Sequence, residues 1–310
     1  MIRHSPFRVG IAVAATAVAL SGCATFTDTD VVAETADATI TNDDFEPLAN
    51  EYFANPEVFG TAPIEDGRAN AEQSRILLGV MVRQMLINQF LDENDVDATE
   101  IRQTYKDTAF TGTPVANVSD DMQNLIADIE EQPRNEALSL TEPPPAEQLR
   151  TLYADVPAST GVTCVRHILL DTEAEADDVL VELADGADFA TLAVERSTDP
   201  TAADNGGAIA NVDNECVPLQ TVLQGFDPGF AAGALAGTEG VASGPYESSF
   251  GWHVIMHRPW DEVSDSIVQL HQPGESGIYL FDGFAATTDV AVNPRFGTWD
   301  PLTATVLPIG

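Results

Sequence analysis

The apolar residues of the first half of the chain recur at helical spacing. Residues 76–91 predict a helix with one broad apolar face that polar side chains interrupt. The apolar residues of this face are Ile76, Val80, Leu86, Ile87, Phe90 and Leu91. Such a face is typical of a heavily buried amphipathic helix rather than a membrane span. Shorter helices are expected around residues 99–106, 119–131 and 146–154.

The segment before this long helix predicts a strand followed by another helix. Ala38 and Ile40 alternate with polar residues, as in a short half-buried strand. Either Asn42 or Asp43 is expected to cap the helix that follows. The apolar face of that helix consists of Phe45, Leu48 and Tyr52.

The pattern changes after about residue 160. The stretch TCVRHILL reads as a strand with Val165, His167 and Leu169 on one side. A helix is expected over 173–185, with Ala176, Leu180, Leu183 and Ala184 on its inner face, and Asp188 is a good cap for the next helix. A turn-rich loop, a helix near 226–236 and a closing strand follow. This order predicts an α+β unit rather than a βαβ repeat.

Two histidines stand in these apolar strands. His167 lies in the middle of the first strand, and His253 lies in GWHVIMHRP, the closing strand. One such histidine is commonly a hydrogen-bonded core residue, but two in the first and last strands of one unit need a further explanation. His253 and His257 are four positions apart, and on a helix two histidines at this spacing can bind one zinc ion. On a strand, at ~3.3 Å per residue, they lie about 13 Å apart, which is too far to share an ion. We therefore expect no metal site.

Composition sets the remaining limits. A chain of 310 residues predicts one large or two medium domains, and a hydrophobic content of 44% suffices for a core. The balance of 13 basic against 50 acidic residues gives a net charge of −37. Such a surface repels nucleic acids and anionic lipid headgroups, so neither is an expected ligand.

The N-terminus carries a targeting signal. Basic residues precede an apolar run over 9–20, which has the length of a signal-peptide core. The sequence Leu20-Ser21-Gly22-Cys23 resembles the lipobox of bacterial lipoproteins. The resemblance implies removal of residues 1–22, acylation of Cys23, and an exported protein anchored by lipid on the extracytoplasmic side of the membrane. An ordinary secretory signal with a chance cysteine is the alternative.

Two cysteines are left if Cys23 carries lipid. Cys164 and Cys216 form an even pair, and an oxidising compartment favours a disulfide between them. Spacing alone does not show whether their Cα atoms lie within bridging distance.

Residues 164–259 resemble the parvulin family of peptidyl-prolyl isomerases, as found in bacterial PpiC, PrsA and SurA proteins. The matching pieces, in order, are VRHILL, DFATLAVERSTDP, NGG, FDPGFAAGALAGTEG and SGPYESSFGWHVI. The resemblance implies a small antiparallel sheet wrapped by helices. The N-terminal part and the tail are similar, more weakly, to the helical chaperone module of SurA-type foldases.

These features predict a five-part organisation of the chain. The expected parts are a signal peptide at 1–22, a flexible tether at 23–38, a helical SurA-like module at 39–160, a parvulin-like domain at 161–260, and a tail at 261–310 that packs on the helical module.

The resemblance also implies the site residues. His167 and His253 would lie side by side at the floor of the site, with Ser248 and Asp199 beside them, the register at Asp199 being open by one position. The proline pocket would be lined by the apolar residues Phe226, Phe230 and Leu235. The family's usual GDLG is replaced here by GAIA, which places Ala208 and Ala210 in that loop, and Tyr246 replaces an aliphatic residue.

The implied activity is cis-trans isomerisation of X-Pro bonds in unfolded or nascent exported polypeptides. No bond is broken in this reaction, so no cofactor is expected. The basic residues that recognise phosphate in some relatives are absent, so a preference for phosphopeptides is not expected. The alternative is a catalytically idle parvulin fold within a chaperone that holds unfolded clients between its N-terminal helices.

Overall fold

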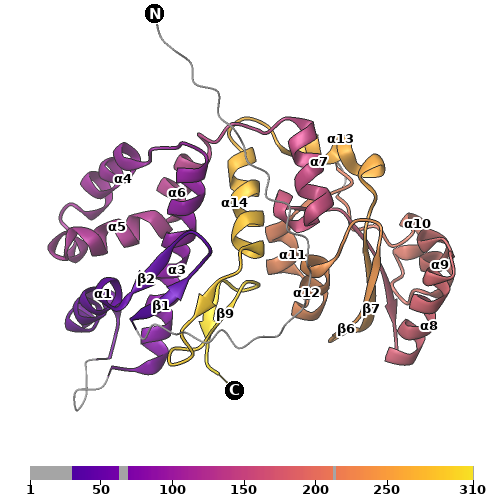
Figure 1. Cartoon of the computed structure of the whole chain (residues 1–310), viewed down its shortest axis with the longest axis horizontal. Coiled ribbons are helices and arrows are strands. Elements are labelled where there is room, and N and C mark those ends of the chain that lie inside the picture. Colours follow the sequence, from indigo (N-terminus) through magenta and orange to yellow (C-terminus); the bar gives the residue numbers. More distant parts are fainter. Residues whose placement is uncertain (1–29, 63–68, 212–213, 310) are drawn as a thin grey trace, which may run out of the picture.

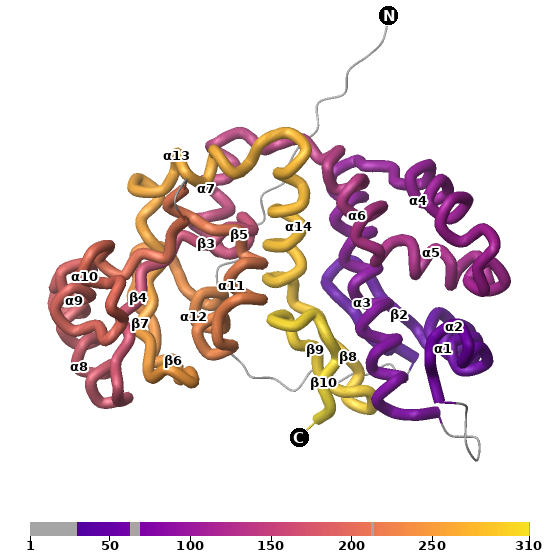
Figure 2. The backbone as a smooth tube through the Cα atoms, turned by 180° about the vertical axis from the view of Figure 1, so that it is seen from behind, coloured from indigo at the N-terminus to yellow at the C-terminus, as the bar shows by residue number. Residues whose placement is uncertain are grey.

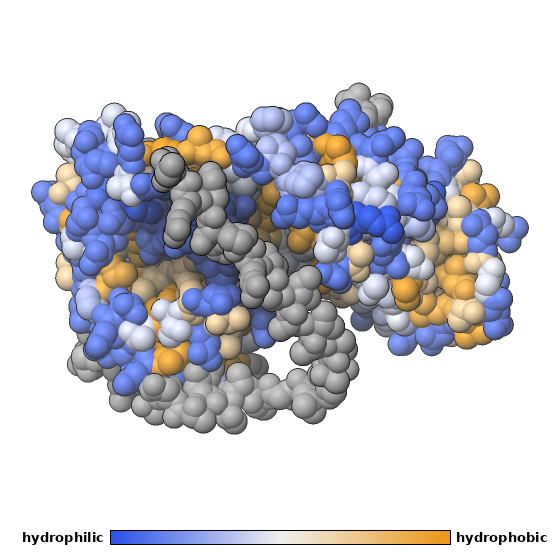
Figure 3. All heavy atoms as spheres, turned by 45° about the horizontal axis from the view of Figure 1, so that its top comes forward, coloured by the Kyte–Doolittle hydropathy of each residue, from blue (hydrophilic) through white to orange (hydrophobic). Residues whose placement is uncertain are grey.

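A computed structural model describes residues 30–62, 69–211 and 214–309. The predicted signal peptide and Cys23 lie outside these residues. Figure 1 shows the N-terminal helices on one side, the small sheet with its helices on the other, and helix α14 between them. No helix within the described ranges combines the length and apolarity that a bilayer crossing requires. Hydrophilic side chains dominate the face in Figure 3.

A small sheet opens the described part of the chain. Strand β1 (Val31–Glu34) lies between β2 (Thr39–Thr41) and β8 (Ala291–Val292), antiparallel to both. The tether predicted over 23–38 is therefore wrong at β1. Pairing on both edges satisfies the backbone of β1 and buries Val32 and Ala33, which the acidic composition of the segment did not indicate.

The first half of the chain is helical, as predicted, but the helices α2 (Pro56–Phe59) and α6 (Glu131–Leu138) and the short segments η2 (Pro114–Asn117) and η3 (Pro157–Thr160) were missed. α1 (Asn42–Ala54) begins after Thr41, which forms the capping box with Asp44, so the predicted caps Asn42 and Asp43 are wrong. The long helix is α3 (Ala71–Glu93), capped by Asn70. The other helical segments are α4 (Thr99–Tyr105), η1 (Lys106–Phe110), α5 (Asp120–Ile129) and α7 (Ala146–Asp155).

The second half contains a three-stranded antiparallel sheet in the order β4-β7-β6. Its strands are β4 (Val165–Leu170), β6 (Ala242–Ser248) and β7 (Gly251–His257). Two short strands, β3 (Val162–Thr163) and β5 (Val217–Pro218), pair beside it. The helices are α8 (Glu173–Ala184), α9 (Phe189–Arg196), α10 (Ala202–Asn205), α11 (Leu219–Gly225) and α12 (Pro228–Ala236). Asp188 caps α9, as predicted.

The two faces of this sheet bury different clusters. One cluster joins Ile168 and Val254 to α8 and α9, and the other joins Val165 and Ile255 to α12. Successive side chains of a strand point to opposite faces, so this division fixes where each strand residue points. His167 shares a face with Val165, and His253 shares a face with Ile255. Both histidines therefore lie on the α12 side.

The C-terminal residues return to the N-terminal helices. α13 (Trp260–Leu270) packs on α7, while α14 (Ser276–Thr287) contacts α3, α6 and α11. The hairpin β9 (Thr298–Asp300) and β10 (Thr305–Leu307) follows, and β10 lies against α3. Figure 2 shows the same arrangement from behind, with α14 between α3 and α11. One apolar cluster includes residues of α3, α6, α7, α13, α14 and the β9–β10 hairpin.

Candidate functional site

The two strand histidines meet across the sheet. In the register of β4 and β7, Leu169 lies opposite His253 and His167 lies opposite Ile255. His167 and His253 are therefore diagonal neighbours on one face, and their ring centroids lie 5.5 Å apart in a stacked arrangement. Both side chains are buried.

Hydrogen bonds join the histidines to the other two predicted polar residues. The Nδ1 atoms of His167 and His253 lie 3.3 Å apart, and Nε2 of His167 lies 3.0 Å from Oδ2 of Asp199. Nε2 of His253 lies 2.8 Å from Oγ of Ser248. The structure thus brings His167, His253, Asp199 and Ser248 into one series of hydrogen-bond contacts. Asp199, rather than a neighbouring position, is the residue that contacts His167.

When both imidazoles are neutral, the partners at the two ends of this series of contacts set the proton positions. A carboxylate only accepts hydrogen bonds, so His167 donates its Nε2–H to Asp199 and presents a bare Nδ1. His253 then donates its Nδ1–H to His167, and its bare Nε2 accepts the hydroxyl proton of Ser248. Every group is satisfied with both imidazoles neutral and Asp199 ionised.

The pKa shifts have the same direction as this assignment. Burial, together with a smaller effect of the neighbouring His167, lowers the pKa of His253 to about 4. Burial also lowers the pKa of His167, against the opposing effect of Asp199. Burial disfavours ionisation of Asp199, but hydrogen bonds from Thr201 and the contact with His167 outweigh it and hold the pKa of this carboxyl below its usual value.

Two aromatic rings form a wall above the imidazoles. The ring of Phe230 meets His167 and His253 edge to face, at centroid distances of 5.4 and 5.2 Å. Phe226 stacks on Phe230 at 4.9 Å. Phe230 is 2% exposed whereas Phe226 is 36% exposed. The wall therefore has a buried end at the histidines and an open end at Phe226.

The apolar neighbours of this wall differ partly from those predicted. The cluster around Phe230 includes the half-buried Leu223 and Tyr246 but not Leu235. Leu235 is five positions after Phe230 and therefore about 140° around α12, so the structure does not bring it to this wall. Leu223 was missed because α11 was not predicted. Tyr246 lies opposite His253 in the β6–β7 pair.

Asp227 connects the aromatic wall to the turn that carries Ser248. Its Oδ1 accepts from the backbone N–H of Gly229 and so caps α12, one turn before Phe230. Its Oδ2 accepts from both the backbone N–H and the hydroxyl of Ser249. One carboxylate therefore fixes α12 against the β6–β7 turn.

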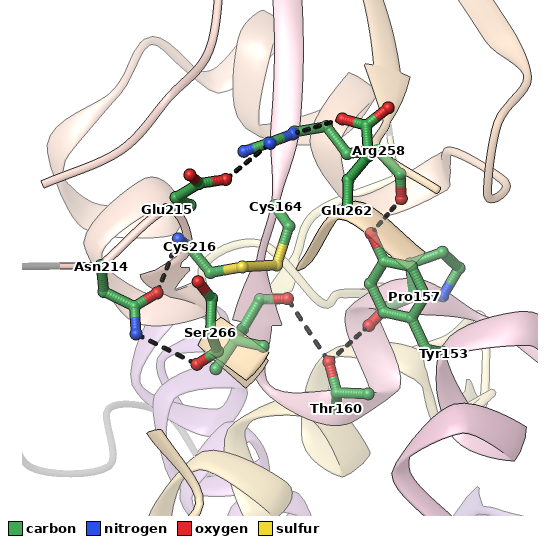
Figure 4. The surroundings of a disulfide bond; sticks show 11 residues. Tyr153, Pro157, Thr160, Cys164, Asn214, Glu215, Cys216, Arg258, Glu262 and Ser266 are labelled. Carbon is green, nitrogen blue, oxygen red and sulfur yellow. Dashed lines mark hydrogen bonds and ion pairs between the residues drawn. A yellow bond between two sulfur atoms is a disulfide. The ribbon is translucent and has the colours of Figure 1, made fainter. Parts of the chain in front are cut away.

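The predicted cysteine pair is joined in the structure, where Cys164 and Cys216 have a Cα–Cα distance of 4.4 Å. Both cysteines belong to the cluster of the N-terminal helices rather than to those of the sheet. Figure 4 shows Arg258 beside the disulfide, paired with Glu215 and Glu262. The disulfide thus lies where the sheet unit joins the helical part.

No cluster of residues suited to hold a metal ion occurs in the ranges that the structure describes. His257 is buried on the same strand as His253, and its Nε2–H donates to the carbonyl of Ala234 at 2.7 Å. Its ring is thus engaged with α12 rather than with the other two histidines.

Comparison with known proteins places the sheet unit in a family. Residues 169–258 match the family described as "Rotamase: PPIC-type PPIASE domain". The foldase protein PrsA of Clostridium kluyveri is 47% identical over 89 residues, which are 29% of this chain and 24% of that protein. The parvulin-like PPIase of Rickettsia bellii is 41% identical over 92 residues, 29% of this chain and 30% of that protein.

The chain thus matches about a quarter to a third of the length of these two relatives. The crystal structure of PrsA from Bacillus subtilis aligns over 84% of this chain and 94% of that chain, at 17% identity and a TM-score of 0.29. That score is too low to support inference outside the matched domain. The match, the sheet order and the paired histidines together show that this chain contains a parvulin-type, PpiC-family peptidyl-prolyl isomerase domain.

Proposed function

We propose that this protein is a foldase that isomerises X-Pro bonds in unfolded exported polypeptides. The observation that carries the proposal is the hydrogen-bonded floor of His167 and His253 directly beneath the ring of Phe230. A proline ring fits against aromatic side chains, and the polar floor lies within reach of the carbonyl that precedes it.

The chemistry of the reaction suits such a site. Rotation about an amide has a barrier of ~18–20 kcal/mol because the planar bond is stabilised by resonance. The twisted amide loses this resonance and becomes less charge-separated, so an apolar wall favours it over the planar ground state. Neutral imidazoles beneath the wall can position the carbonyl without placing a full charge against the ring. No covalent step or cofactor is needed.

The test is NMR exchange spectroscopy on an Ala-Pro peptide, with the chain from residue 23 carrying Cys23→Ser. We expect catalysed exchange, a loss of about tenfold or more in His253→Asn and Phe230→Ala, and no change in Val181→Ala, which alters an exposed side chain of α8. The proposal fails if the unsubstituted chain does not accelerate exchange. It also fails if the site variants are folded and as active as the control.

A second candidate is a chaperone that holds clients with an idle isomerase domain. It is favoured by a cavity of about 830 Å³ among the N-terminal helices, whose largely polar lining also includes the apolar residues Ile40, Leu48, Met81 and Met85. This candidate predicts that an inactive His253→Asn chain still suppresses client aggregation. If the variant loses both isomerisation and the suppression of aggregation, the N-terminal helices do not hold clients without the isomerase site.

Export and lipid anchoring are further parts of the proposal. They rest on the signal-like N-terminus and its lipobox. The full-length chain is expected in the membrane fraction of its cell, with an acylated Cys23 in the mass spectrum of its N-terminal peptide. Cys23→Ser should release it, and equal membrane retention of both forms would contradict the anchor.

A further inference from the structure

A second cavity, of about 630 Å³, lies between the two halves of the protein. Residues of α3 and α6, of α11 and α14, and of the segment 301–304 line it. Figures 1 and 2 both show α14 at this position, between α3 and α11. The volume lies within the range of ordinary ligand sites, about 300–1,000 Å³.

The walls combine apolar side chains with a few charges. The apolar part includes Leu86, Leu138, Leu223, Ile278, Phe281 and Leu302. The charged residues are Arg83 on α3, Glu131 and Arg134 on α6, and Asp282 on α14. Glu131 is exposed, so the two arginines and Asp282 dominate the interior.

Within the ranges that the structure describes, neither arginine has a carboxylate partner, which is unexpected in a chain with 50 acidic and 13 basic residues. Among the described residues, no carboxylate lies within the 4.0 Å ion-pair distance of Arg83 or Arg134, whereas Arg102, Lys106 and Arg258 each have at least one. Nε of Arg83 is shielded from solvent and has no hydrogen-bond acceptor in the described part of the chain. Nε of Arg134 reaches only the side-chain oxygen of Asn135, at 3.2 Å.

The one interior carboxylate offsets this charge only in part. Asp282 accepts a hydrogen bond from Gln220 at 3.3 Å rather than pairing with an arginine. Burial raises the pKa of Asp282 to about 6, with Gln220 and Arg134 acting in the opposite direction. Burial also lowers the pKa of Arg83, and the charge of Arg134 adds to that effect. The cavity therefore has two unneutralised guanidinium groups beside apolar walls.

We propose that this cavity binds a carboxylate-bearing apolar segment of an unfolded client polypeptide. A guanidinium that is partly desolvated and unpaired gains from a carboxylate, which both arginines can bind through paired N–H donors. The apolar walls bury the side chains next to that carboxylate. The identity of the occupant as a client rests on the foldase function proposed above.

The position of the cavity favours a client segment as the occupant. Leu223 and Leu302 line the cavity and also pack against the cluster that holds Phe230. Helix α11 thus has the cavity on one side and the aromatic wall of the isomerase site on the other. A polypeptide engaged at Phe226 and Phe230 has a second contact point close by.

The test uses two dansyl-labelled peptides without proline, Ala-Leu-Phe-Glu-Leu-Ala and its Gln counterpart, blocked at both ends. Fluorescence anisotropy with the chain from residue 23, carrying Cys23→Ser, is expected to show at least tenfold tighter binding of the Glu peptide. The Arg83→Gln/Arg134→Gln double variant is expected to remove that preference, because tenfold corresponds to about 1.4 kcal/mol and hydrogen bonds to a charged group can supply this. Arg150→Gln, which removes a charge from the exposed side chain on α7, serves as the matched control.

A third variant moves the affinity the other way. Asp282→Asn removes the competing interior carboxylate but keeps an acceptor for Gln220, so it should tighten binding of the Glu peptide several-fold. Equal binding of the two peptides, equal weakening in Arg150→Gln, or weaker binding in Asp282→Asn would each overturn the inference. Isomerisation of an Ala-Pro peptide should be unchanged in the arginine double variant. Peptide binding without isomerase activity would count against the foldase proposal and not against this one.

Discussion

The proton arrangement at the histidine pair makes a quantitative prediction about pH. With a pKa of about 4, His253 is about 97% neutral at pH 5.5, whereas a histidine with the ordinary pKa of ~6.5 would be only about 9% neutral. An added proton forces Nε2–H of His253 toward Ser248, whose hydroxyl then turns to the carbonyl of Gly251, at 3.2 Å. It also places a charge beneath Phe230, where an apolar surface favours the twisted amide. Activity should therefore depend on the neutral form.

The expected profile of kcat/KM is flat from about pH 8 to pH 5.5, with a fall centred near pH 4. NMR exchange on an Ala-Pro peptide measures it, since this assay needs no coupled protease. A midpoint near pH 6.5, with the protein still folded, would refute the assignment of two neutral imidazoles. Circular dichroism at each pH provides the control for folding.

That control matters because the same shift affects stability. The folded pKa of His253 lies below its unfolded value, so the unfolded chain binds more protons between about pH 6.5 and pH 4. The contribution of this group is complete above pH 6.5 and is lost as the pH falls through that window. Burial also lowers the pKa values of His257 and His271 to about 4, so both residues add to this loss of stability. Asp282, raised to about 6, acts in the opposite direction.

Three further predictions concern the junction of the two halves. The disulfide joins residues that are 52 positions apart in the sequence. The Cys164→Ala/Cys216→Ala variant should therefore lose about 4 kcal/mol of unfolding free energy, measured by urea denaturation, and a loss below about 1 kcal/mol would contradict this. A Cβ on Gly283 would lie 2.4 Å from the carbonyl oxygen of residue 159, so Gly283→Ala should lower the unfolding free energy by about 1–3 kcal/mol. Gly225→Ala has open space around its Cβ and serves as the control in the same thermal melts. Tyr153→Phe removes the buried 2.8 Å hydrogen bond to the carbonyl of residue 258 and should cost about 1–3 kcal/mol, and an unchanged melting temperature would show that this carbonyl finds another donor.

The sequence identified the parts of the fold that repeat a simple pattern. The long helix α3 and the strands β4 and β7 repeat apolar residues at a regular spacing, and Asp188 is a strong capping residue. Strand β1 was missed because two buried residues are too few to show a period, and its pairing partner β8 is distant in the sequence. α11 was missed because its buried residues, Leu219 and Val222, are just as few.

At the candidate site, the four polar residues that residue type and family motif indicated lie together in the structure. Three separate segments supply His167, Asp199, and the pair Ser248 and His253. Their hydrogen bonds form one series only because the register of β4 against β7 places the two histidines side by side. Leu235 illustrates the limit of spacing, since a position on α12 indicates the wall only if the helix turns that face inward. The cavity with Arg83 and Arg134 had no sequence signal, because its sides come from helices far apart in the chain.

The loop that departs most from the family pattern does not remove what holds the site in place. Gly207 has a φ of +77°, and a Cβ there would lie 2.2 Å from the carbonyl oxygen of His167, so the glycine retained at this position is required by both conformation and space. The loop is held to β4 by two backbone bonds, from the N–H of His167 to the carbonyl of Gly207 at 2.8 Å and from the N–H of Ile209 to the carbonyl of Val165 at 2.9 Å. These bonds do not depend on the side chains at positions 208 and 210. Alanines in place of the usual Asp and Gly therefore leave His167 in position, which favours an active isomerase over an idle one.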